Sequence, residues 1–272
     1  MTGSGVPDHA HNLRSTGGAG KPVGVITRGT TGFNRLRRSD RWTIHRPEIT
    51  SLLRGTSTPL AVDVGYGASF TTTVEWAQRL RTVNPNIEVV GLEIDPERVL
   101  APRDGVRFEL GGFELAGYRP HLVRAFNVLR QYDVAEVEAT WGMLSQRLAP
   151  GGFIVEGTCD EIGRRAAWVL LDAAGPLSLT LSWDPWDVEM PSDVAERLPK
   201  MLIHRNVPGE KIYDLLQACD DAYERAAGWD TYGPRVRWEK ALELLDGEIP
   251  LERQRHRSRD NQLTIAWEHV AP

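Results

Sequence analysis

Two glycines and one carboxylate, set between apolar runs, are the residues of this chain whose types and spacing most clearly imply chemistry. Gly65 and Gly67 follow the apolar run Leu60–Val64, and glycine there lets the backbone turn tightly and lie against a ligand without an intervening Cβ. Glu93 ends the next apolar run, where an ionised carboxylate can accept hydrogen bonds from both hydroxyls of a ribose. This pattern predicts a nucleoside site.

The same stretch argues against a dinucleotide such as NAD. A dinucleotide fingerprint has a third glycine three residues after the second, so that the start of the helix can hold a pyrophosphate. Phe70 stands at that position, and Glu93 comes later than the roughly 20 residues that a dinucleotide site leads one to expect. Both departures suit a ligand with a ribose and no phosphate, and they leave an NAD-dependent oxidoreductase as a distant alternative.

The elements that position these residues follow an α/β pattern. Strands are expected near 60–64, 88–93, 106–110, 121–126 and 152–157, alternating with helices, and this alternation predicts a parallel sheet with helices on both faces. Segments 166–172 and 177–183 flank a turn of the hairpin type. Helical spacing over 193–202, 210–227 and 237–245 predicts a helical cap, and alternation over 263–267 predicts a final strand that returns to the sheet.

Four segments in order resemble the class I S-adenosylmethionine (SAM) dependent methyltransferases. They are Asp63-x-Gly65-x-Gly67, Gly91-Leu92-Glu93-Ile94-Asp95-Pro96, residues 106–115 and residues 148–155. The resemblance spans about residues 58–183. It implies a Rossmann-like sheet, mostly parallel with an antiparallel edge strand, and a transferase that uses S-adenosyl-L-methionine for methylation. Segments 28–31 and 123–132 also resemble an uncharacterised actinobacterial methylase group, which implies no substrate.

The resemblance implies which residues hold the cofactor. They are Asp63, Gly65, Tyr66, Gly67, Glu93, Ile94, Gly112, Phe113 and Asn127. Asp63 would lie beside the glycine turn, orienting backbone and water near the methionyl amine, or would be a structural acid bonded to the loop. Many members of the family carry an acid at the position of Gly112, so adenine is expected to rest on the backbone of Phe113 and on Ile94. Glu114 could substitute for that acid, or could be solvated.

Two residues, Asn127 and Asp160, are the candidates for catalysis. Asn127 follows a strand at the edge of the sheet where ligands of open α/β sheets bind, so it either contacts substrate or caps a helix. Arg124 could reach the substrate as well. Residues 158–161, which include Cys159 and Asp160, follow the fifth strand where a general base would belong, although a capping role explains Asp160 equally well.

Two basic stretches leave the acceptor open. The arginines at 28, 35, 37, 38, 41 and 46, and the cluster at 253–259, could be surface residues, an anion or nucleic-acid clamp, or a contact to the cofactor carboxylate. The net charge of −5 and a cap over 184–248, in which His204 could face the pocket, favour a small-molecule acceptor. RNA is the alternative acceptor. A SAM- or nucleoside-binding regulatory protein without catalytic activity is an alternative of another class.

The amino-acid composition limits what can be expected of the core, the compartment, a membrane and a metal site. Of 272 residues 41% are hydrophobic, enough for a full core, and the two cysteines, Cys159 and Cys219, suit a reducing cytoplasm. The sequence has no apolar run of the ~18 residues that a membrane span needs, and no zinc-ligand spacing, so neither a membrane nor a metal site is expected. The expected organisation is a disordered tail (1–22), a basic segment on the core (23–57), a SAM-binding domain (58–183), a helical cap (184–250) and a basic segment with the last strand (251–272).

Overall fold

The structure is a computed structural model that describes residues 22–26, 31–252 and 261–272. Most of the expected N-terminal tail, Arg28 and the basic cluster at 253–259 lie outside the described residues.

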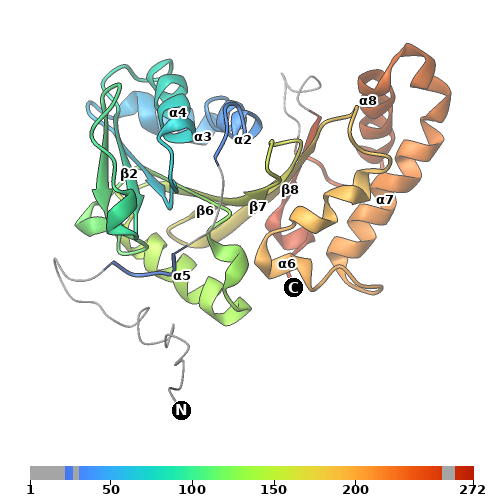
Figure 1. Cartoon of the computed structure of the whole chain (residues 1–272). Helices are drawn as coiled ribbons and strands as arrows, with labels where there is room; N and C mark the ends of the chain where they lie inside the picture. The colour runs from blue at the N-terminus through green and yellow to red at the C-terminus, as the bar shows by residue number, and fades with distance from the viewer. Residues whose placement is uncertain (1–21, 27–30, 253–260) are drawn as a thin grey trace.

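One sheet of eight strands runs through the described chain in the order β3-β2-β1-β4-β5-β6-β7-β8. The first five strands in sequence pair in parallel, and the last three extend the sheet as an antiparallel edge (Figure 1). The expected Rossmann-like α/β fold is therefore confirmed, and the expected hairpin and final strand form its antiparallel edge. The strands are β1 (Leu60–Val64), β2 (Glu88–Glu93), β3 (Val106–Leu110), β4 (Leu122–Phe126), β5 (Phe153–Cys159), β6 (Arg165–Asp172), β7 (Gly175–Trp183) and β8 (Gln262–Ala266).

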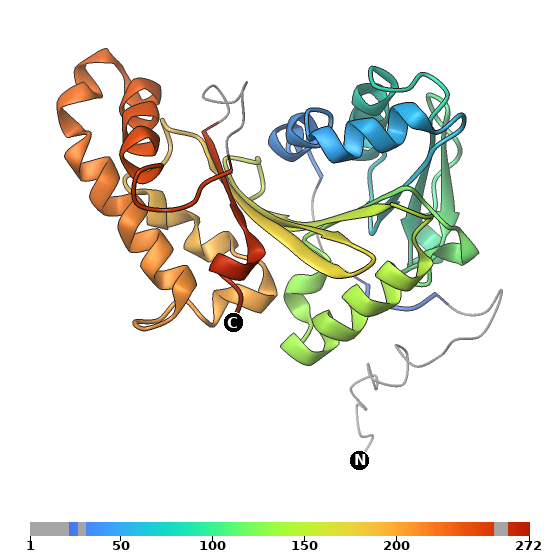
Figure 2. The same ribbon diagram turned by 180° about the vertical axis from the view of Figure 1, so that it is seen from behind.

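The central strands are buried on both faces, which explains why their sequences are continuous apolar runs rather than alternating ones. Along β6, Trp168 and Leu170 join the core on one face, whereas Ala167 and Val169 join the core on the other. Helices from the N-terminal part of the chain cover the first face, and a long helix packs on the second face, in the core that the C-terminal helices share (Figures 1 and 2). They are α2 (Arg37–Thr43), α3 (Pro47–Gly55) and α4 (Thr71–Arg81) on the first face, and α5 (Val134–Arg147) on the second.

Helix α5 shows how local sequence sets an element boundary. Asp133 precedes the helix, and the backbone N–H of Asp133 donates to the Glu136 carboxylate at 2.8 Å, which forms one half of a capping box. The short 3-10 turns lie in the connections that follow the strands. They are η1 (Pro96–Arg98), η2 (Leu115–Gly117) and η3 (Leu129–Gln131).

The C-terminal helices pack beside the antiparallel edge of the sheet, where they are seen at the right of Figure 1. Trp238 of α8 meets Trp183 of β7 edge-on, with ring centroids 4.3 Å apart, and both indoles are buried in the core that α5 also lines. These helices therefore pack against the antiparallel part of the sheet and share the core of its second face. The elements are η4 (Pro191–Arg197), α6 (Lys200–Ile203), α7 (Lys211–Arg225), η5 (Ala227–Tyr232), α8 (Pro234–Leu245) and η7 (Trp267–His269).

Candidate functional site

A cavity of about 360 Å³ lies at the carboxyl ends of β1, β4 and β5, the edge where ligands of open α/β sheets bind. It has walls from the glycine turn, from the loops after β4 and β5, and from the segment that leads into α2. The lining residues are Thr31, Arg35, Leu36, Asp63, Val64, Gly65, Tyr66, Gly67, Thr72, Phe126, Asn127, Arg130, Gln131, Cys159 and Arg197.

The glycine turn after β1 has the geometry that only glycine adopts easily. Gly65 and Gly67 have φ angles of 70° and 80°, in the left-handed region. A Cβ on Gly65 would lie 2.4 Å from the Val128 side chain, so the turn also needs the missing side chain for space. The neighbouring Tyr66 contributes to the cavity wall, and its hydroxyl donates to the carbonyl of Arg98 at 2.9 Å.

The Glu93 carboxylate lies at the end of β2 and is 1% exposed. Its Oε2 accepts from the Gly67 N–H at 2.9 Å, and its Oε1 accepts from the N–H groups of Ile94 and Asp95 at 2.9 and 3.1 Å. The carboxylate therefore holds the glycine turn and the start of the next loop together. Glu93 lines a second, smaller pocket, which shares Val64 and Gly65 with the larger cavity. We call the two adjoining pockets the groove.

The smaller pocket, lined by Glu93, Ile94, Gly112 and Phe113, has a volume of only about 20 Å³. That volume holds roughly one water molecule. The segment 22–26, three of whose residues line the same pocket, occupies the space beside Phe113. We call this segment the N-terminal strap.

Three backbone groups fix the N-terminal strap. The Phe113 N–H donates to the Val23 carbonyl at 2.9 Å, the Val23 N–H donates to the Glu114 carboxylate at 2.6 Å, and the Val25 N–H donates to the Tyr132 hydroxyl at 2.5 Å. The strap thus accepts a hydrogen bond from the Phe113 N–H, a backbone group on which adenine was expected to rest. The Glu114 carboxylate, for which solvation was one interpretation, instead accepts a hydrogen bond from the strap.

The strap also explains why residue 112 is glycine rather than an acid. A Cβ on Gly112 would lie 2.1 Å from the carbonyl oxygen of Val23, closer than any real contact. The absence of a carboxylate at this position is therefore a consequence of packing against the strap.

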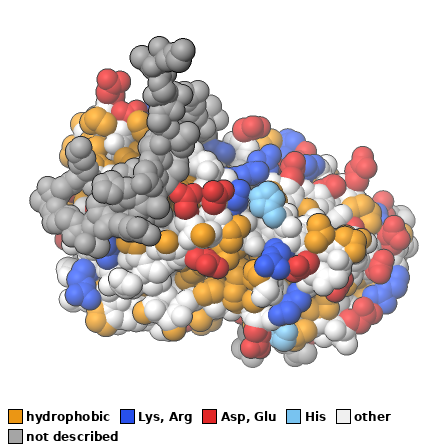
Figure 3. Space-filling model, turned by 90° about the horizontal axis from the view of Figure 1, so that it is seen from below, with side chains coloured by type: hydrophobic (Ala, Val, Ile, Leu, Met, Phe, Trp, Pro, Cys, Tyr) orange, Lys and Arg blue, Asp and Glu red, His pale blue; other side chains and the backbone are white. Residues whose placement is uncertain are grey.

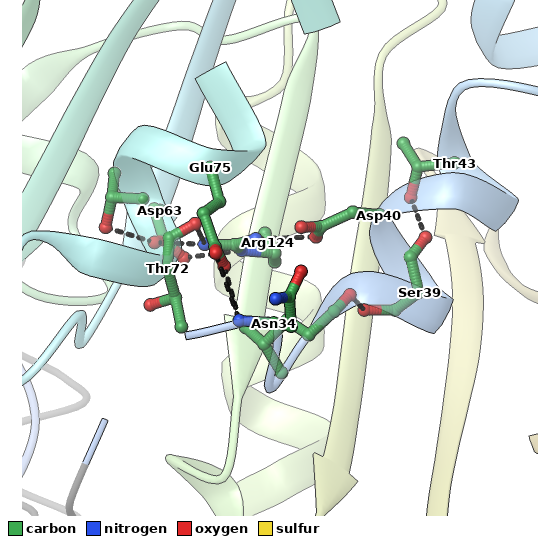
Figure 4. A network of polar contacts seen from close by, with 10 residues as sticks. Asn34, Ser39, Asp40, Thr43, Asp63, Thr72, Glu75 and Arg124 are labelled. Atoms are coloured by element: carbon green, nitrogen blue, oxygen red, sulfur yellow. Dashed lines mark hydrogen bonds and ion pairs between the residues drawn. The ribbon is translucent and has the colours of Figure 1, made fainter. Parts of the chain in front are cut away.

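Asp63 and Arg124 form the centre of a buried ion-pair network (Figure 4). Arg124 donates from Nε and Nη2 to the two oxygens of Asp63 at 2.9 and 2.6 Å, and from Nη1 to Asp40 at 2.7 Å. Thr73 Oγ1 also donates to Asp63, at 2.7 Å. The expectation that Arg124 reaches the substrate is wrong, because its guanidinium is 2% exposed and is engaged inside the network.

The network has more acids than bases. Burial raises the pKa of the Asp40 carboxyl to about 6, against the opposing effect of Arg124, and Asp40 Oδ2 has no hydrogen-bond partner among the described residues. Asp63 keeps its place at the cavity wall, where the glycine turn begins. Its carboxylate bonds Arg124 on β4 and Thr73 on α4 rather than the loop, and its influence on a methionyl amine remains a prediction.

Asn127 joins the ends of β4 and β5. Its Oδ1 accepts from the Cys159 N–H at 2.9 Å, and its Nδ2 lies 3.2 Å from Cys159 Sγ. Asn127 has a φ of 62°, which asparagine tolerates better than most residues. Burial raises the pKa of the Cys159 thiol, an effect that Arg35 and Asn127 oppose, so Cys159 lines the cavity as a protonated thiol at neutral pH.

Asp160 closes a turn instead of facing the cavity. Its carboxylate accepts from the N–H groups of Ile162, Arg164 and Arg165, and the turn leads from β5 into β6. Asp160 therefore has the capping role that was the alternative to catalysis, but it caps the turn of a β-hairpin rather than a helix. Thr158 donates to the carbonyl of Arg197, in the η4 turn.

The helical region contributes little to the cavity. Of the described residues of 184–248, Arg197 alone appears in its wall. His204, which could have faced the pocket, is exposed on the surface and does not line the cavity. The expectation that this region encloses the acceptor is therefore wrong, because α7 and α8 pack beside the sheet rather than over its carboxyl edge.

Three of the lining residues are arginines, namely Arg35, Arg130 and Arg197. One of them was singled out in the sequence. Arg35 belongs to the basic segment and donates to the Asp160 carbonyl at 2.8 Å. Arg38 and Arg46 of that segment pair instead with Asp184 and Glu252. Arg130 and Arg197 were not singled out in the sequence. Arg130 follows Asn127 at a strand end and could have been found, whereas nothing in the local sequence marks Arg197.

Within the described residues, no group of three or more His, Cys, Asp or Glu side chains is placed to hold a metal ion, and none of the described helices is long and apolar enough to cross a membrane. Both cysteines are free and buried.

No protein-family model matches the chain, and no curated protein matches it. Several solved methyltransferase structures are similar. Human N-acetylserotonin methyltransferase in complex with SAM matches at 19% identity over 46% of this chain and 37% of its own, with a TM-score of 0.31. CalO1 from calicheamicin biosynthesis, with SAH bound, matches at 15% over 44% and 35%, with a TM-score of 0.31.

Magnesium protoporphyrin IX methyltransferase from Synechocystis PCC 6803, with SAM bound, matches at 17% identity over 59% of this chain and 80% of its own, with a TM-score of 0.35. The chain thus spans little more than a third of the length of the first two of these proteins. The strand order and the register carry the fold assignment.

Proposed function

We propose that this protein is a SAM-dependent methyltransferase that acts on a small molecule. The observation that carries the proposal is the Glu93 carboxylate at the end of β2, 2.9 Å from the Gly67 N–H of the glycine turn. An acid suited to ribose hydroxyls and a glycine turn thus meet at the carboxyl edge of a sheet with the order β3-β2-β1-β4-β5.

The residues of the groove fit such a cofactor once the N-terminal strap moves. Glu93 would accept the ribose hydroxyls, the Phe113 N–H and Ile94 would hold the base, and Gly65 and Gly67 would face the methionyl part in the larger cavity. When bound, this cofactor supplies a methyl group that is already electrophilic.

The protein then has to hold the acceptor in line with that methyl group. The Asp63–Arg124 pair holds β1 and β4 in register, because it joins Asp63 to the residue directly opposite it in the sheet. The Asn127–Cys159 contacts hold β4 to β5. These two connections fix the floor of the cavity on which the acceptor would lie.

The size of the cavity supports a small acceptor over RNA. At about 360 Å³ it is in the range of small-ligand pockets. On the face drawn in Figure 3, acidic and basic side chains of the described residues are intermingled, without a continuous basic band. RNA stays the alternative acceptor, and the narrower resemblance to an actinobacterial methylase group stays a prediction without a substrate.

A nucleoside-binding regulatory protein is the second candidate. The N-terminal strap favours it, because the strap occupies the Phe113 N–H that the base would need. A protein that only senses SAM would bind it and transfer no methyl group.

Calorimetry with SAM, S-adenosylhomocysteine (SAH) and NAD tests the proposal. We expect both sulfur compounds to bind and NAD not to bind; the opposite order would overturn the proposal. Transfer of a labelled methyl group from SAM to a small-molecule extract then separates the methyltransferase from the regulatory protein, and transfer to total RNA separates the two acceptors.

A further inference from the structure

Two arginines in the cavity wall, Arg130 and Arg197, have little to neutralise them. Within the described residues the Arg130 guanidinium has no hydrogen-bond or ion-pair partner. Arg197 Nε lies 3.5 Å from the Glu196 carboxylate and makes no hydrogen bond there. Glu196 is half-exposed and also pairs with Arg165 at 3.1 Å.

The two guanidiniums affect each other. Burial lowers the pKa of Arg130, and the charge of Arg197 lowers it further, with Glu196 acting in the opposite direction. Placing two like charges in one partly buried wall is unfavourable unless an anion lies between them. The described wall therefore carries more positive than negative charge, with Arg35, Arg130 and Arg197 against Asp63.

Among the described residues of the cavity wall, none is available as a general base. Asp63 is the one acid in its described wall, and both of its oxygens are engaged by Arg124. Cys159 is held as a thiol by burial. An acceptor that must lose a proton before it attacks finds no residue here to take that proton.

We propose that the methyl acceptor is a small carboxylic acid, held as its carboxylate by Arg130 and Arg197 and methylated on that carboxylate. The proposal rests on the methyltransferase function proposed above. Arginine suits this role because its planar fork matches a carboxylate. A cationic amine acceptor would be repelled by the same wall.

The step balances without a proton transfer. One carboxylate oxygen of the acceptor forms a bond to the methyl carbon, and the bond between that carbon and the sulfonium sulfur breaks. Its electron pair stays on sulfur. The negative charge of the acceptor and the positive charge of the sulfonium disappear together, and the products are a methyl ester and SAH.

Binding of probe acids tests the site without any reaction. Calorimetry would compare acetate with acetamide and benzoate with benzamide, on the full protein with and without saturating SAH. The variants are Arg130→Gln and Arg197→Gln, and the matched control is Arg205→Gln, an exposed arginine paired with Glu210 at 3.0 Å outside the cavity wall.

We expect the carboxylates to bind at least tenfold more tightly than the amides to the wild type and to the control. This preference should vanish in Arg130→Gln and Arg197→Gln, whose SAH affinity should stay unchanged. Equal binding of acids and amides to the wild type, or an unaltered preference in both cavity variants, overturns the proposal. If SAH fails to bind while the carboxylate preference persists, the methyltransferase function falls and the anion site stands.

The product gives the second readout. Labelled methyl groups transferred from SAM to a small-molecule extract should become volatile as methanol after mild alkali, because esters hydrolyse. The cavity variants should lose this label and the control should keep it. Label that resists alkali would show methylation at another atom and would overturn the carboxylate assignment.

Discussion

The Glu93 carboxylate and the Gly67 N–H are hydrogen-bonded at 2.9 Å across the groove. The residue that the sequence assigns to ribose thus also organises the glycine turn. Its other oxygen holds the N–H groups of Ile94 and Asp95. Removal of the whole carboxylate would leave three N–H donors without their acceptor, so a test of ribose binding needs a variant that keeps the shape of the side chain.

Glu93→Gln should weaken SAH binding at least tenfold. Hydrogen bonds to a charged acceptor contribute about 1.5–3 kcal/mol each, and the amide keeps only part of them. Calorimetry measures the affinity, and Glu97→Gln, a nearby exposed acid, is the matched control. Unchanged affinity in a folded Glu93→Gln protein would remove Glu93 from the site.

Gly67→Val should abolish SAH binding, because the branched side chain would stand where the cofactor meets the backbone. The φ of 80° at Gly67 adds strain of about 1–3 kcal/mol. Gly233→Val separates the two effects, since Gly233 has a φ of 100° and open space around it, outside the groove. Both variants should melt at lower temperature, and only Gly67→Val should lose binding. Loss of binding in both would assign the effect to stability.

Val23→Pro should tighten SAH binding up to about tenfold. The substitution removes the N–H that donates to Glu114 at 2.6 Å, and so loosens the strap that occupies the base pocket. Stopped-flow measurement of the association rate and calorimetry of the affinity would both detect this. Weaker binding would mean that the N-terminal strap is a wall of the site rather than a competitor for it.

Arg124→Met should destabilise the protein by about 3–5 kcal/mol, because it leaves the buried carboxylates of Asp63 and Asp40 without their cation. Arg107→Met, which breaks an exposed pair with Glu88 at 3.0 Å, should cost less than about 1 kcal/mol. Denaturant unfolding measures both values. Adding Asp40→Asn and Asp63→Asn to Arg124→Met should recover stability; no recovery would show that packing, not charge, causes the loss.

Glu156 on β5 should make stability depend on pH. Burial raises the pKa of its carboxyl from 4.5 to about 8, opposed in part by the Trp141 indole, although neither carboxyl oxygen has a hydrogen-bond partner among the described residues. The folded state therefore holds a proton that the unfolded state releases above pH 4.5. The free energy of unfolding should fall as pH rises from about 4.5 to 8, by up to about 1.4 kcal/mol per pH unit from this residue.

Glu156→Gln should remove this slope, whereas Glu138→Gln, on the exposed face of α5, should keep it. Urea unfolding at several pH values measures the slope. A wild-type slope unaffected by Glu156→Gln would place the titrating group elsewhere.

The sequence by itself determined the strands and the residues at their ends. Continuous apolar runs mark strands that are buried on both faces, and glycines and acids mark where those strands stop, because both signals are local in the chain. For this reason Gly65, Gly67, Glu93 and Asn127 can be assigned to one edge of the sheet from the sequence alone.

Tertiary structure decided what these residues contact. Arg124 has the position of a substrate residue in the sequence, but β4 lies beside β1, and the pairing with Asp63 follows from that adjacency. Val23 reaches Phe113, and Arg197 reaches the cavity, over separations of many residues in the chain. Such contacts depend on how packed elements fold back on one another, and the apolar periodicity that predicts elements carries no information on that packing.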